Sequence, residues 1–385
     1  MREPWSDLLE CWRSGRTAAL ATVTSIRGSA PREVGSAMLV RDDGTVVGSV
    51  SGGCVEGAVY ETALEVISSG RPAREQYGIA DEAGIAVGLT CGGEIEIFVE
   101  AVSPSTFPDL DRLAELVALE RPVAIATVVE HPDDEVVGRR LLIEPDAAPS
   151  GSLGSPRRDA AVHDDAEGVL ATGRSATLTY GVDGERRGLG MRVLVQVFAP
   201  PPRLLIFGAV DHAAALAQVG AFLGYDVTVC DARQVFATPE RFPAAARVVV
   251  DWPHRYLAAE HEAGRIDART ALAVLTHDPK FDVPLLTVAL RLPAIGFIGA
   301  MGSRRTHDDR LERLREAGVT DEELTRLSSP VGLDLGGRTP QETAVSIAAE
   351  LVAAQWGGSG RPLRVLDTPV HGPNLPLDLS VGRSS

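Results

Sequence analysis

Two of the four cysteines stand beside paired glycines, an arrangement that suits chemistry at sulfur. Cys54 ends residues 51–54 (SGGC) just before an expected helix over residues 55–68, and Cys91 opens residues 91–93 (CGG) before an expected strand. A helix start lowers the pKa of a nearby thiol, and glycines let a bulky ligand approach the sulfur. Such thiolates bind soft metals or carry sulfur. We therefore treat Cys54 and Cys91 as candidate catalytic residues, with an inert buried thiol as the alternative for each.

Several other catalytic patterns are missing from the sequence. A zinc site needs about four ligands at recognisable spacing, and the chain has no C-x-x-C or H-x-x-x-H. It also has no G-x-S-x-G elbow and no Walker A sequence. Metal ligands therefore stay unassigned, and serine-nucleophile and nucleotide-hydrolase chemistry are set aside.

The turn after residues 204–207, an expected buried strand, could take part in nucleotide binding. A dinucleotide fold places G-x-G-x-x-G there and an acid about 20 residues later. The chain supplies Gly208 and Asp231, 23 residues apart, with Arg233 close behind. Val210 replaces the second glycine, and Asp211 puts a negative charge where phosphates would lie. The pattern favours the fold more than it favours binding of NAD(P).

Two later loops follow expected strands of the same sheet. His277 and Asp278 follow residues 271–275, and residues 302–305 (GSRR) follow residues 294–298. Ligands of such sheets bind beyond the carboxyl ends of the strands. Gly302, Ser303, Arg304 and Arg305 combine exposed amides, a hydroxyl and two guanidiniums, which suits an anion or phosphate. The alternatives are a helix start with solvated arginines here and a turn capped by Asp278.

The elements expected around these motifs fall into two classes. After residue 203, apolar strands alternate with helices, which indicates a Rossmann-like parallel sheet with helices on both faces. Before it, short strands separated by glycine turns indicate a small mixed α+β domain. We therefore predict an α/β protein whose C-terminal Rossmann-like sheet is preceded by this smaller domain.

The smaller domain is itself repeated at a period of about a hundred residues. Residues 19–23 (ALATV) match residues 124–128 (AIATV), and four later glycine-containing matches follow at an offset of 103. The second copy lacks the 28–33 (GSAPRE) and SGGC stretches, and alignment of the last strands sets Met191 against Cys91. Residues present in one copy only are not required by the shared fold. This argument predicts functional roles for Ser29, Arg32, Gly52, Gly53, Cys54, Cys91 and Gly92.

Composition sets the limits of the prediction. The 385 residues include 37 basic and 53 acidic side chains, and the net charge of −16 makes nucleic acid and anionic membranes poor partners. No apolar run is long enough for an integral membrane segment, and with four cysteines we expect a cytoplasmic protein. Proline-rich seams predict domains at 1–102, at 103–200 as a degenerate second copy, and at 201–356, with a flexible tail over 357–385.

Several of these stretches resemble the XdhC/CoxI family of xanthine dehydrogenase and CO dehydrogenase accessory proteins. The first domain does so through residues 28–32, 35–40, 48–56 and 91–93. The Rossmann-like domain does so through residues 223–229, 231–233, 276–278 with Asp282, 298–305 and 330–337, followed by Thr339. The turn at Gly208 departs from the family's Gly-Ala-Gly-His sequence.

The resemblance implies a maturation chaperone that binds molybdenum cofactor (molybdopterin, with the dinucleotide form left open). Such a protein protects the cofactor, supports its sulfuration and inserts it into a molybdenum hydroxylase apo-enzyme. A cysteine desulfurase as sulfur donor and a homodimer are further expectations. The alternatives are an NAD(P)-dependent oxidoreductase using the Asp231 sheet and a thiol-based sulfur-transfer enzyme. The expectation is an accessory protein more than a turnover enzyme.

Overall fold

The computed structural model describes residues 4–28, 32–78, 93–145, 147–293 and 295–366 of the chain. These residues form two compact units, which divide between Pro200 and Pro201. The first unit is Met1–Pro200, and the described part of the second is Pro201–Leu366. The second unit includes a short 3-10 helix, Leu363–Val365, near its carboxyl end.

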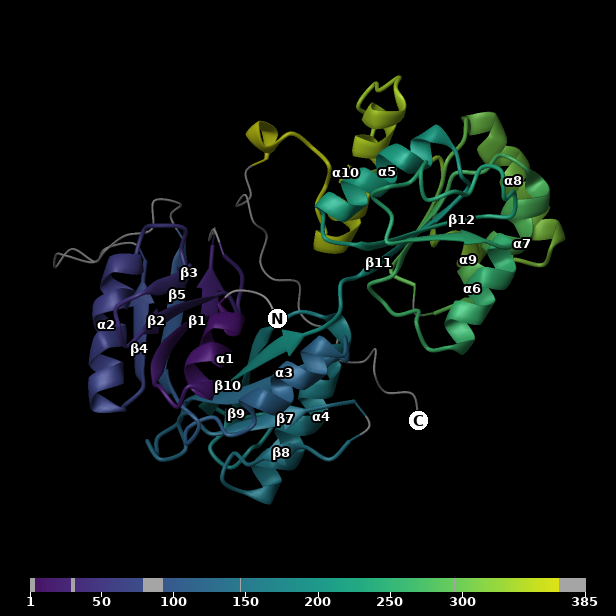
Figure 1. Cartoon of the computed structure of the whole chain (residues 1–385). Coiled ribbons are helices and arrows are strands. Elements are labelled where there is room, and N and C mark those ends of the chain that lie inside the picture. The colour runs from purple at the N-terminus through teal and green to yellow at the C-terminus, as the bar shows by residue number, and fades with distance from the viewer. Residues whose placement is uncertain (1–3, 29–31, 79–92, 146, 294, 367–385) are drawn as a thin grey trace. The chain divides into compact units, whose positions relative to one another are not determined.

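The first half of the first unit is a five-stranded antiparallel sheet with two helices (Figure 1). Its strand order is β3-β2-β1-β5-β4. Apolar side chains of β1, β2 and β5 on one sheet face pack against Val59, Ala63 and Val66 of α2. The elements of this half are α1 (Trp5–Arg13), β1 (Ala18–Arg27), β2 (Ala37–Arg41), β3 (Val46–Gly48), α2 (Glu56–Ser69), β4 (Ala73–Tyr77) and β5 (Glu94–Val102).

The second half of this unit repeats the first element by element. Its sheet has the order β8-β7-β6-β10-β9, which is the same order when β6 is set on β1 and β10 on β5. The register of the central pair shifts at the same place in both halves, between Val23 and Ser25 and between Val128 and Glu130. The elements of this half are α3 (Leu110–Ala118), β6 (Val123–Glu130), β7 (Arg140–Ile143), β8 (Ser150–Gly151), α4 (Pro156–Thr172), β9 (Ala176–Gly181) and β10 (Gly190–Phe198).

These registers correct one detail of the expected repeat. Ile95 lies opposite Ile26 on β1, and Met191 lies opposite Tyr180 on β9 as Ile95 lies opposite Tyr77 on β4. Met191 is therefore equivalent to Ile95, an offset of 96, and does not correspond to Cys91. The loops before the last strand differ in length between the halves, so the offset changes there. The sequence alone does not reveal this change, because short apolar strands align almost equally well in several registers.

The two halves pack together through a shared apolar cluster. Trp5 and Leu8 of α1 and Leu20 of β1 join Leu110 of α3 and Ile125 of β6 in one core. Trp5 also meets Phe198 of β10 edge to face, with ring centroids 4.9 Å apart. Neither half buries this face by itself, so the first unit is stabilised as a pair of halves.

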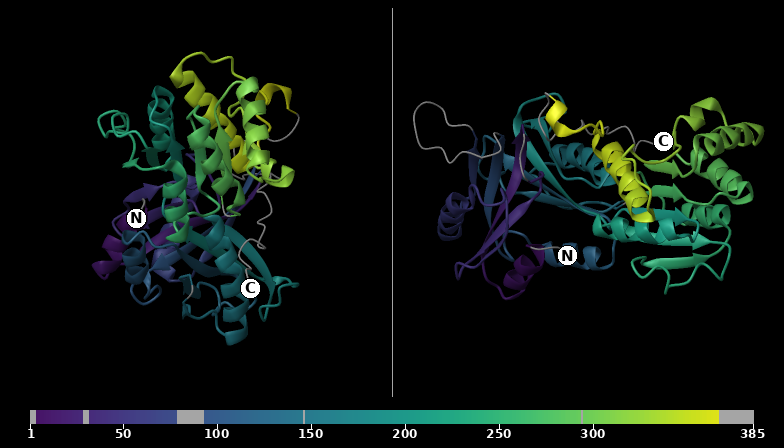
Figure 2. Two further views of the ribbon diagram at one scale, coloured as in Figure 1. Left: turned by 90° about the vertical axis from the view of Figure 1, so that its right-hand side faces the viewer. Right: turned by 90° about the horizontal axis from the view of Figure 1, so that it is seen from above.

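The second unit is a six-stranded, all-parallel sheet of order β13-β12-β11-β14-β15-β16. In chain order this is 3-2-1-4-5-6, the arrangement of dinucleotide-binding sheets. Figure 2 shows helices on both faces of the sheet. The predicted α/β class with a Rossmann-like sheet is therefore confirmed. The strands are β11 (Arg203–Phe207), β12 (Asp226–Asp231), β13 (Arg247–Val250), β14 (Ala271–Val274), β15 (Phe297–Ala300) and β16 (Leu327–Ser328).

Alternating side chains of these strands face two separate helical layers. Leu204 and Ile206 pack with α5 (Asp211–Phe222) and α10 (Pro340–Trp356), whereas Leu205 and Phe207 face the opposite layer. That opposite layer consists of α6 (Pro253–Glu262), α7 (Pro279–Arg291), α8 (Arg304–Glu316) and α9 (Asp321–Leu324). A capping box is present at the start of α10, where Thr339 and Glu342 bond each other's backbone amides.

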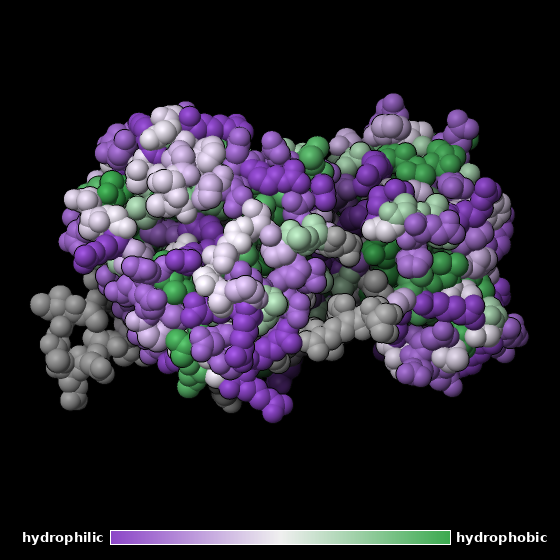
Figure 3. Space-filling model, turned by 90° about the horizontal axis from the view of Figure 1, so that it is seen from below, coloured by the Kyte–Doolittle hydropathy of each residue, from purple (hydrophilic) through white to green (hydrophobic). Residues whose placement is uncertain are grey.

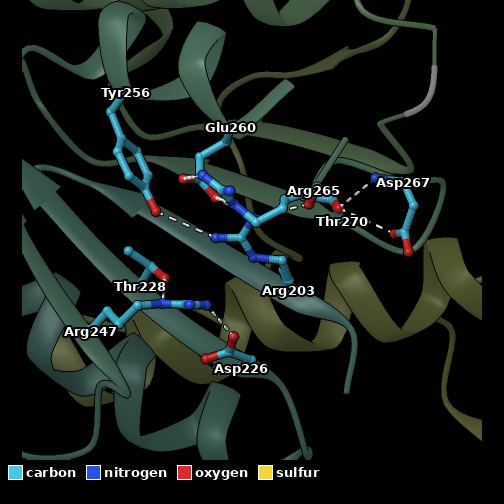
Figure 4. A network of polar contacts seen from close by, with 9 residues as sticks. All are labelled: Arg203, Asp226, Thr228, Arg247, Tyr256, Glu260, Arg265, Asp267 and Thr270. Carbon is cyan, nitrogen blue, oxygen red and sulfur yellow. Dashed lines mark hydrogen bonds and ion pairs between the residues drawn. The ribbon is translucent and has the colours of Figure 1, made fainter. Parts of the chain in front are cut away.

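A network of polar contacts joins residues at the amino ends of β11, β12 and β13 (Figure 4). Arg203, the third residue of the unit, donates to Glu260 at 2.6 Å, and Arg265 donates to the other oxygen of the same carboxylate at 2.6 Å. Glu260 is only 6% exposed, so these bonds compensate a buried charge. This end of the sheet is structural, and the candidate ligand-binding residues lie at the opposite, carboxyl end.

No helix among the described residues is long and apolar enough to cross a membrane. On the face drawn in Figure 3, hydrophobic residues form small groups separated by hydrophilic ones.

Candidate functional site

The loop before α2 is organised around the carboxylate of Glu56. Oε1 and Oε2 of this residue accept hydrogen bonds from the hydroxyl groups of Ser49 (2.7 Å) and Ser51 (2.5 Å). They also accept from the backbone amides of Ser51, Gly52 and Gly53 at 2.8–3.0 Å. Burial raises the pKa of Glu56, but the bonds from Ser49 and Ser51 outweigh it and hold the pKa at about 2. The carboxylate is therefore ionised at neutral pH and fixes the loop.

Cys54 lies on this loop, two residues before the first residue of α2. It is half-buried against the apolar cluster beneath the helix, and its amide donates to the Ser51 hydroxyl at 3.0 Å. The amides of Gly52 and Gly53, two residues predicted to be functional, donate to the Glu56 carboxylate. The side chain that organises this loop was missed as a site residue. Its sequence signal is a serine seven residues before an acid, which recurs as Ser152 and Asp159.

The other predicted residues of this domain are placed only in part. Arg32 is exposed at the edge of the described chain. Ser29, Cys91 and Gly92 lie outside the described residues. Their grouping with Cys54 stays a prediction.

The equivalent loop of the second half keeps the carboxylate and lacks the thiol. Asp159, equivalent to Glu56 at the offset of 103, accepts from the Ser152 hydroxyl at 2.9 Å and the Leu153 amide at 2.6 Å. The position of Cys54 is taken by Arg157, whose side chain is 68% exposed and pairs with Glu185. We propose that the two halves are duplicated domains in which only the first retains a functional loop.

In the second unit, the first predicted turn is tightly packed against its neighbour. A Cβ on Gly208 would lie 2.8 Å from Thr276 Cγ2 and 3.0 Å from its backbone nitrogen, so only glycine fits. Thr276 follows β14, and β11 and β14 are adjacent strands whose helices cover opposite faces. Gly208 therefore lies at the point where ligands of doubly wound sheets bind.

Asp231, at the end of β12, already uses both of its carboxylate oxygens. Oδ1 accepts from the amide and Nε of Arg233 at 2.8 and 3.0 Å, and Oδ2 accepts from the Ala209 amide and Arg233 Nη2, both at 2.8 Å. Burial raises the pKa of Asp231, but these bonds lower it overall. Four bonds fill the acceptor positions of one carboxylate. Asp231 thus closes the first turn, and it has no acceptor left for ribose hydroxyls in this arrangement.

The loop after β14 places His277 and Asp278 differently. Asp278 is the N-cap of α7, and its side chain accepts from the Lys280 amide at 3.1 Å. Its charge also helps to raise the pKa of Arg233, after the larger effect of the bond to Asp231. The loops after β12 and β14 therefore lie close together. His277 is exposed at this edge.

The loop after β15 has the form expected for an anion cradle. Ser303 is the N-cap of α8 and accepts from the Thr306 amide at 3.1 Å, while Arg304 and Arg305 are exposed in the first turn. That turn contains no acidic residue, so the positive helix start carries two further positive charges. Gly302 approaches Thr306 closely, with 3.1 Å from a Cβ to that side chain.

A buried pair beneath this loop was not identified as a pair from the sequence. Arg310 of α8, 3% exposed, donates to Asp282 of α7 at 3.1 Å and to the Met301 carbonyl at 2.8 Å. Asp282 in turn accepts from the Thr276 hydroxyl. Burial raises the pKa of Asp282, although Thr276 and Arg310 oppose it. The pair joins the loops after β14 and β15 and holds them in register.

Among the described residues, no group of three or more His, Cys, Asp and Glu side chains could hold a metal ion. The arrangement therefore offers a thiol-bearing loop in the first unit and a basic helix start in the second.

The fold and these loop motifs place the chain in the XdhC/CoxI family, to which it belongs. The model of the XdhC and CoxI family matches residues 11–78 and 116–181, that is, both halves of the first unit. The model of the XdhC Rossmann domain matches residues 204–351.

The chain is 30% identical over 347 residues to the molybdenum cofactor insertion chaperone PaoD of Escherichia coli (strain K12), covering 90% of this chain and 86% of that protein. It is 26% identical over 337 residues to a probable xanthine dehydrogenase subunit of Bacillus subtilis (strain 168), covering 87% and 92%. A crystal structure described as a xanthine dehydrogenase from Bacillus halodurans superposes with a TM-score of 0.64 at 23% identity, over 94% of this chain and 98% of that one. This structural similarity shows that the two proteins share a fold.

Proposed function

We propose that this protein is a molybdenum cofactor maturation chaperone for a molybdenum hydroxylase of the xanthine dehydrogenase type. The observation that carries the proposal is the 30% identity, over nine-tenths of the chain, to a molybdenum cofactor insertion chaperone. The thiol loop present in only one half of the first unit supports it. The cofactor is the cargo of such a protein, and the chain has to hold it, shield it and release it.

The residues present suit the two chemically distinct parts of this cargo. A dithiolene-bound molybdenum is a soft centre, for which a thiolate is a suitable ligand. Cys54, held on a loop fixed by Glu56, is our candidate for contact with the metal end or for carrying sulfur during sulfuration. The phosphate of a pterin, or of a dinucleotide form, needs cationic donors. Arg304 and Arg305 at the start of α8 are our candidates for that end.

The handover completes the proposal. A molybdenum hydroxylase apo-enzyme is the acceptor, a cysteine desulfurase supplies the sulfur, and the encounter takes place in the cytoplasm. Because Cys54 is half-buried and not sealed, a sulfur donor can reach its loop without unfolding the domain.

An NAD(P)-dependent oxidoreductase is the second candidate, favoured by the 3-2-1-4-5-6 strand order. The site argues against it, because Asp231 is saturated by Arg233 and the Ala209 amide. Val210 also stands where a glycine would admit the pyrophosphate. We expect no tight binding of NADH or NADPH. A thiol-based sulfur-transfer enzyme without bound pterin is the third candidate and shares Cys54 with the chaperone.

The test is the cofactor content of protein purified without oxygen from a host that makes the cofactor. Wild type, Cys54→Ser and the matched control Arg157→Ser, at the equivalent position of the second half, are compared for molybdenum and pterin per chain. We expect about one cofactor per wild-type and Arg157→Ser chain and at least a tenfold loss in Cys54→Ser. Wild type without pterin but with tight NAD(P)H binding would overturn the chaperone proposal. Persulfide on Cys54 in pterin-free protein would favour the sulfur-transfer enzyme.

The anion site is tested separately on the second unit. Arg304→Ala/Arg305→Ala is compared with Arg313→Ala, which removes an exposed arginine from the far end of the same helix. We expect the double variant to retain much less pterin and the control to retain wild-type amounts. Equal retention in the two variants would exclude this helix start as the phosphate site.

A further inference from the structure

Contacts between the halves of the first unit obey a local two-fold relation. Glu96 of β5 and Arg192 of β10 occupy equivalent positions, and they bond each other at 2.7 and 2.9 Å. Phe98 and Leu194, also equivalent, share a small apolar cluster between the sheets. Equivalent residues touch only where they lie on a two-fold axis. The halves are therefore arranged as the protomers of a symmetric dimer would be.

The polar contacts across this interface break that symmetry. Three ion pairs join strands of the two halves, Glu96 with Arg192, Glu100 with Arg140, and Arg74 with Glu130, and a fourth, Arg13 with Asp111, joins α1 to α3. The first two are largely buried, since their side chains are 7–22% exposed. Arg192 also contacts Glu130 at 3.3 Å, and Thr24 donates to Glu96 at 2.9 Å, so Glu96, Arg192, Glu130 and Arg74 form a continuous network beside the separate Glu100–Arg140 pair.

On the axis, Glu96 faces its own equivalent, Arg192, of opposite charge, and neither of the other two ion pairs between strands has a charged counterpart. The strand registers set Ala37 at the position of Arg140 and Gln196 at the position of Glu100. The counterpart of Arg74 is Thr177, which donates to the Thr24 carbonyl at 2.6 Å. Each ion pair therefore exists only when a first half meets a second half.

We propose that these charges make the two halves specific for each other, so that the inner face of the first half accepts the second half of its own chain and rejects another first half. Two first halves would bring Glu96 against Glu96 and leave Glu100 facing Ala37. Two second halves would bring Arg192 against Arg192 and leave Arg140 facing Gln196. Buried like charges and unpaired buried charges are strongly unfavourable. When a first half meets a second half, each of these side chains has a partner of opposite charge.

Two consequences follow for the assembly. The homodimer predicted from the sequence has to use a face other than this one, because the second half occupies it. Each chain also carries one SGGC loop for each pair of halves. The second half supports the segment leading from Arg32, since a Cβ on Gly35 would lie 2.7 Å from the Ser175 hydroxyl.

The specificity is tested with the full-length chain by cutting the connection between the halves. A protease site is inserted after Ser105, in the exposed segment between β5 and α3, and the cleaved protein is examined by native mass spectrometry. We expect only the one-to-one complex of the two fragments, and no pair of first-half fragments. A mixture in which fragments pair with themselves as readily would overturn the proposal.

The same cleaved protein with Glu96→Gln/Glu100→Gln provides the decisive comparison. Neutral side chains remove the repulsion between two first halves, so we expect self-paired first-half fragments to appear in this variant alone. A matched control is Arg13→Gln/Asp111→Asn, which removes an ion pair between the halves that is about half exposed. If the control self-pairs as much as the test variant, charge at Glu96 and Glu100 does not determine the partner.

A double-mutant cycle on the uncleaved chain measures the central pair directly. Glu96→Gln and Arg192→Gln should each lower the hydrogen-exchange protection of β5 and β10 amides about tenfold, because each leaves its partner without compensation. The double variant should lose little more than either single one. Losses that multiply in the double variant would show that the two charges do not act as a pair. These measurements need no cofactor, so their outcome does not depend on whether the proposed function is correct.

Discussion

The two loops that precede α2 and α4 differ although the domains around them match. Both are fixed by a carboxylate at equivalent positions, Glu56 and Asp159, which accept from a serine hydroxyl and backbone amides. A feature kept in both halves serves the fold. The thiol of Cys54 and its two glycines occur in the first half alone, and we propose that they are the part of the loop that serves function.

The glycines act by postponing the start of the helix. In the second half, Ser155 caps α4 and Pro156 is its first residue, a strong combination for starting a helix. Pro156 is equivalent to Gly53, yet α2 begins only at Glu56, three residues later. Gly52 and Gly53 have φ values of 79° and 120°, which are incompatible with a helix. Cys54 therefore lies on an open loop instead of inside a helical turn.

The largest effect is expected from Arg140→Met, which breaks the buried ion pair between the halves. Glu100 would be left buried without a partner, at a loss of about 3–5 kcal/mol in the free energy of unfolding. Burial already raises the pKa of Glu100 against the opposing effect of Arg140. A group whose pKa is higher in the folded than in the unfolded protein stabilises the fold at pH values below its unfolded-state pKa. That stabilisation is lost as the pH rises through its folded-state pKa. The deficit relative to wild type should therefore grow from acid to neutral pH.

The measurement is denaturant unfolding of both proteins between pH 4 and pH 8. Arg140→Met/Glu100→Gln is the control, since glutamine is what the second half carries at the equivalent position, Gln196. That variant should recover most of the loss and show no added pH dependence. A deficit that does not change with pH would mean that Glu100 is not the group responsible.

A smaller effect is expected from Glu56→Gln, about 2 kcal/mol after allowance for partial exposure. The depressed pKa of Glu56, about 2, means that its contribution is present above pH 4.5 and is lost as pH falls toward 2. Wild type and variant should therefore converge in acid. Cofactor retention should fall as well, because the loop holding Cys54 loses its anchor. Asp159→Asn is the matched control, and it should lower stability while leaving the cofactor content unchanged.

Replacing the helix start of the second half with that of the first should have a still smaller effect. Ser155→Gly/Pro156→Gly removes the cap and the first-turn proline of α4, for about 1 kcal/mol. Circular dichroism and hydrogen exchange of residues 156–159 report the shortening. Protection of these residues at the wild-type level would contradict the view that the glycines of the first half delay α2.

The smallest effect is expected at Arg157, the counterpart of Cys54. Arg157→Ser removes a mostly exposed ion pair with Glu185, and such pairs contribute about 0–1 kcal/mol. Thermal unfolding should shift little, and cofactor content should not change. A loss of cofactor in this variant would show that the second half also contributes to the site, and the contrast between the halves would then fail.

Much of the architecture follows from local sequence. The repeat, the change to alternating strands and helices after residue 203 and the capping box at Thr339 are set by hydrophobic period and turn chemistry. Shorter helices such as α6 and α9 were not predicted, although Pro253 opens α6 and a capping box of Thr320 and Glu323 opens α9. A four- to ten-residue helix depends on packing more than on its own propensity.

The site was predicted only as residue types in suitable loops. The sequence by itself determined that a thiol stands beside two glycines and that two arginines follow Ser303. Tertiary structure decided that the Ala209 amide, 22 residues away, bonds to Asp231, and that the charges of one half meet their partners only in the other. The reason is physical: a short motif fixes local backbone geometry, whereas the partner of a buried charge is chosen by residues that the fold brings from far along the chain.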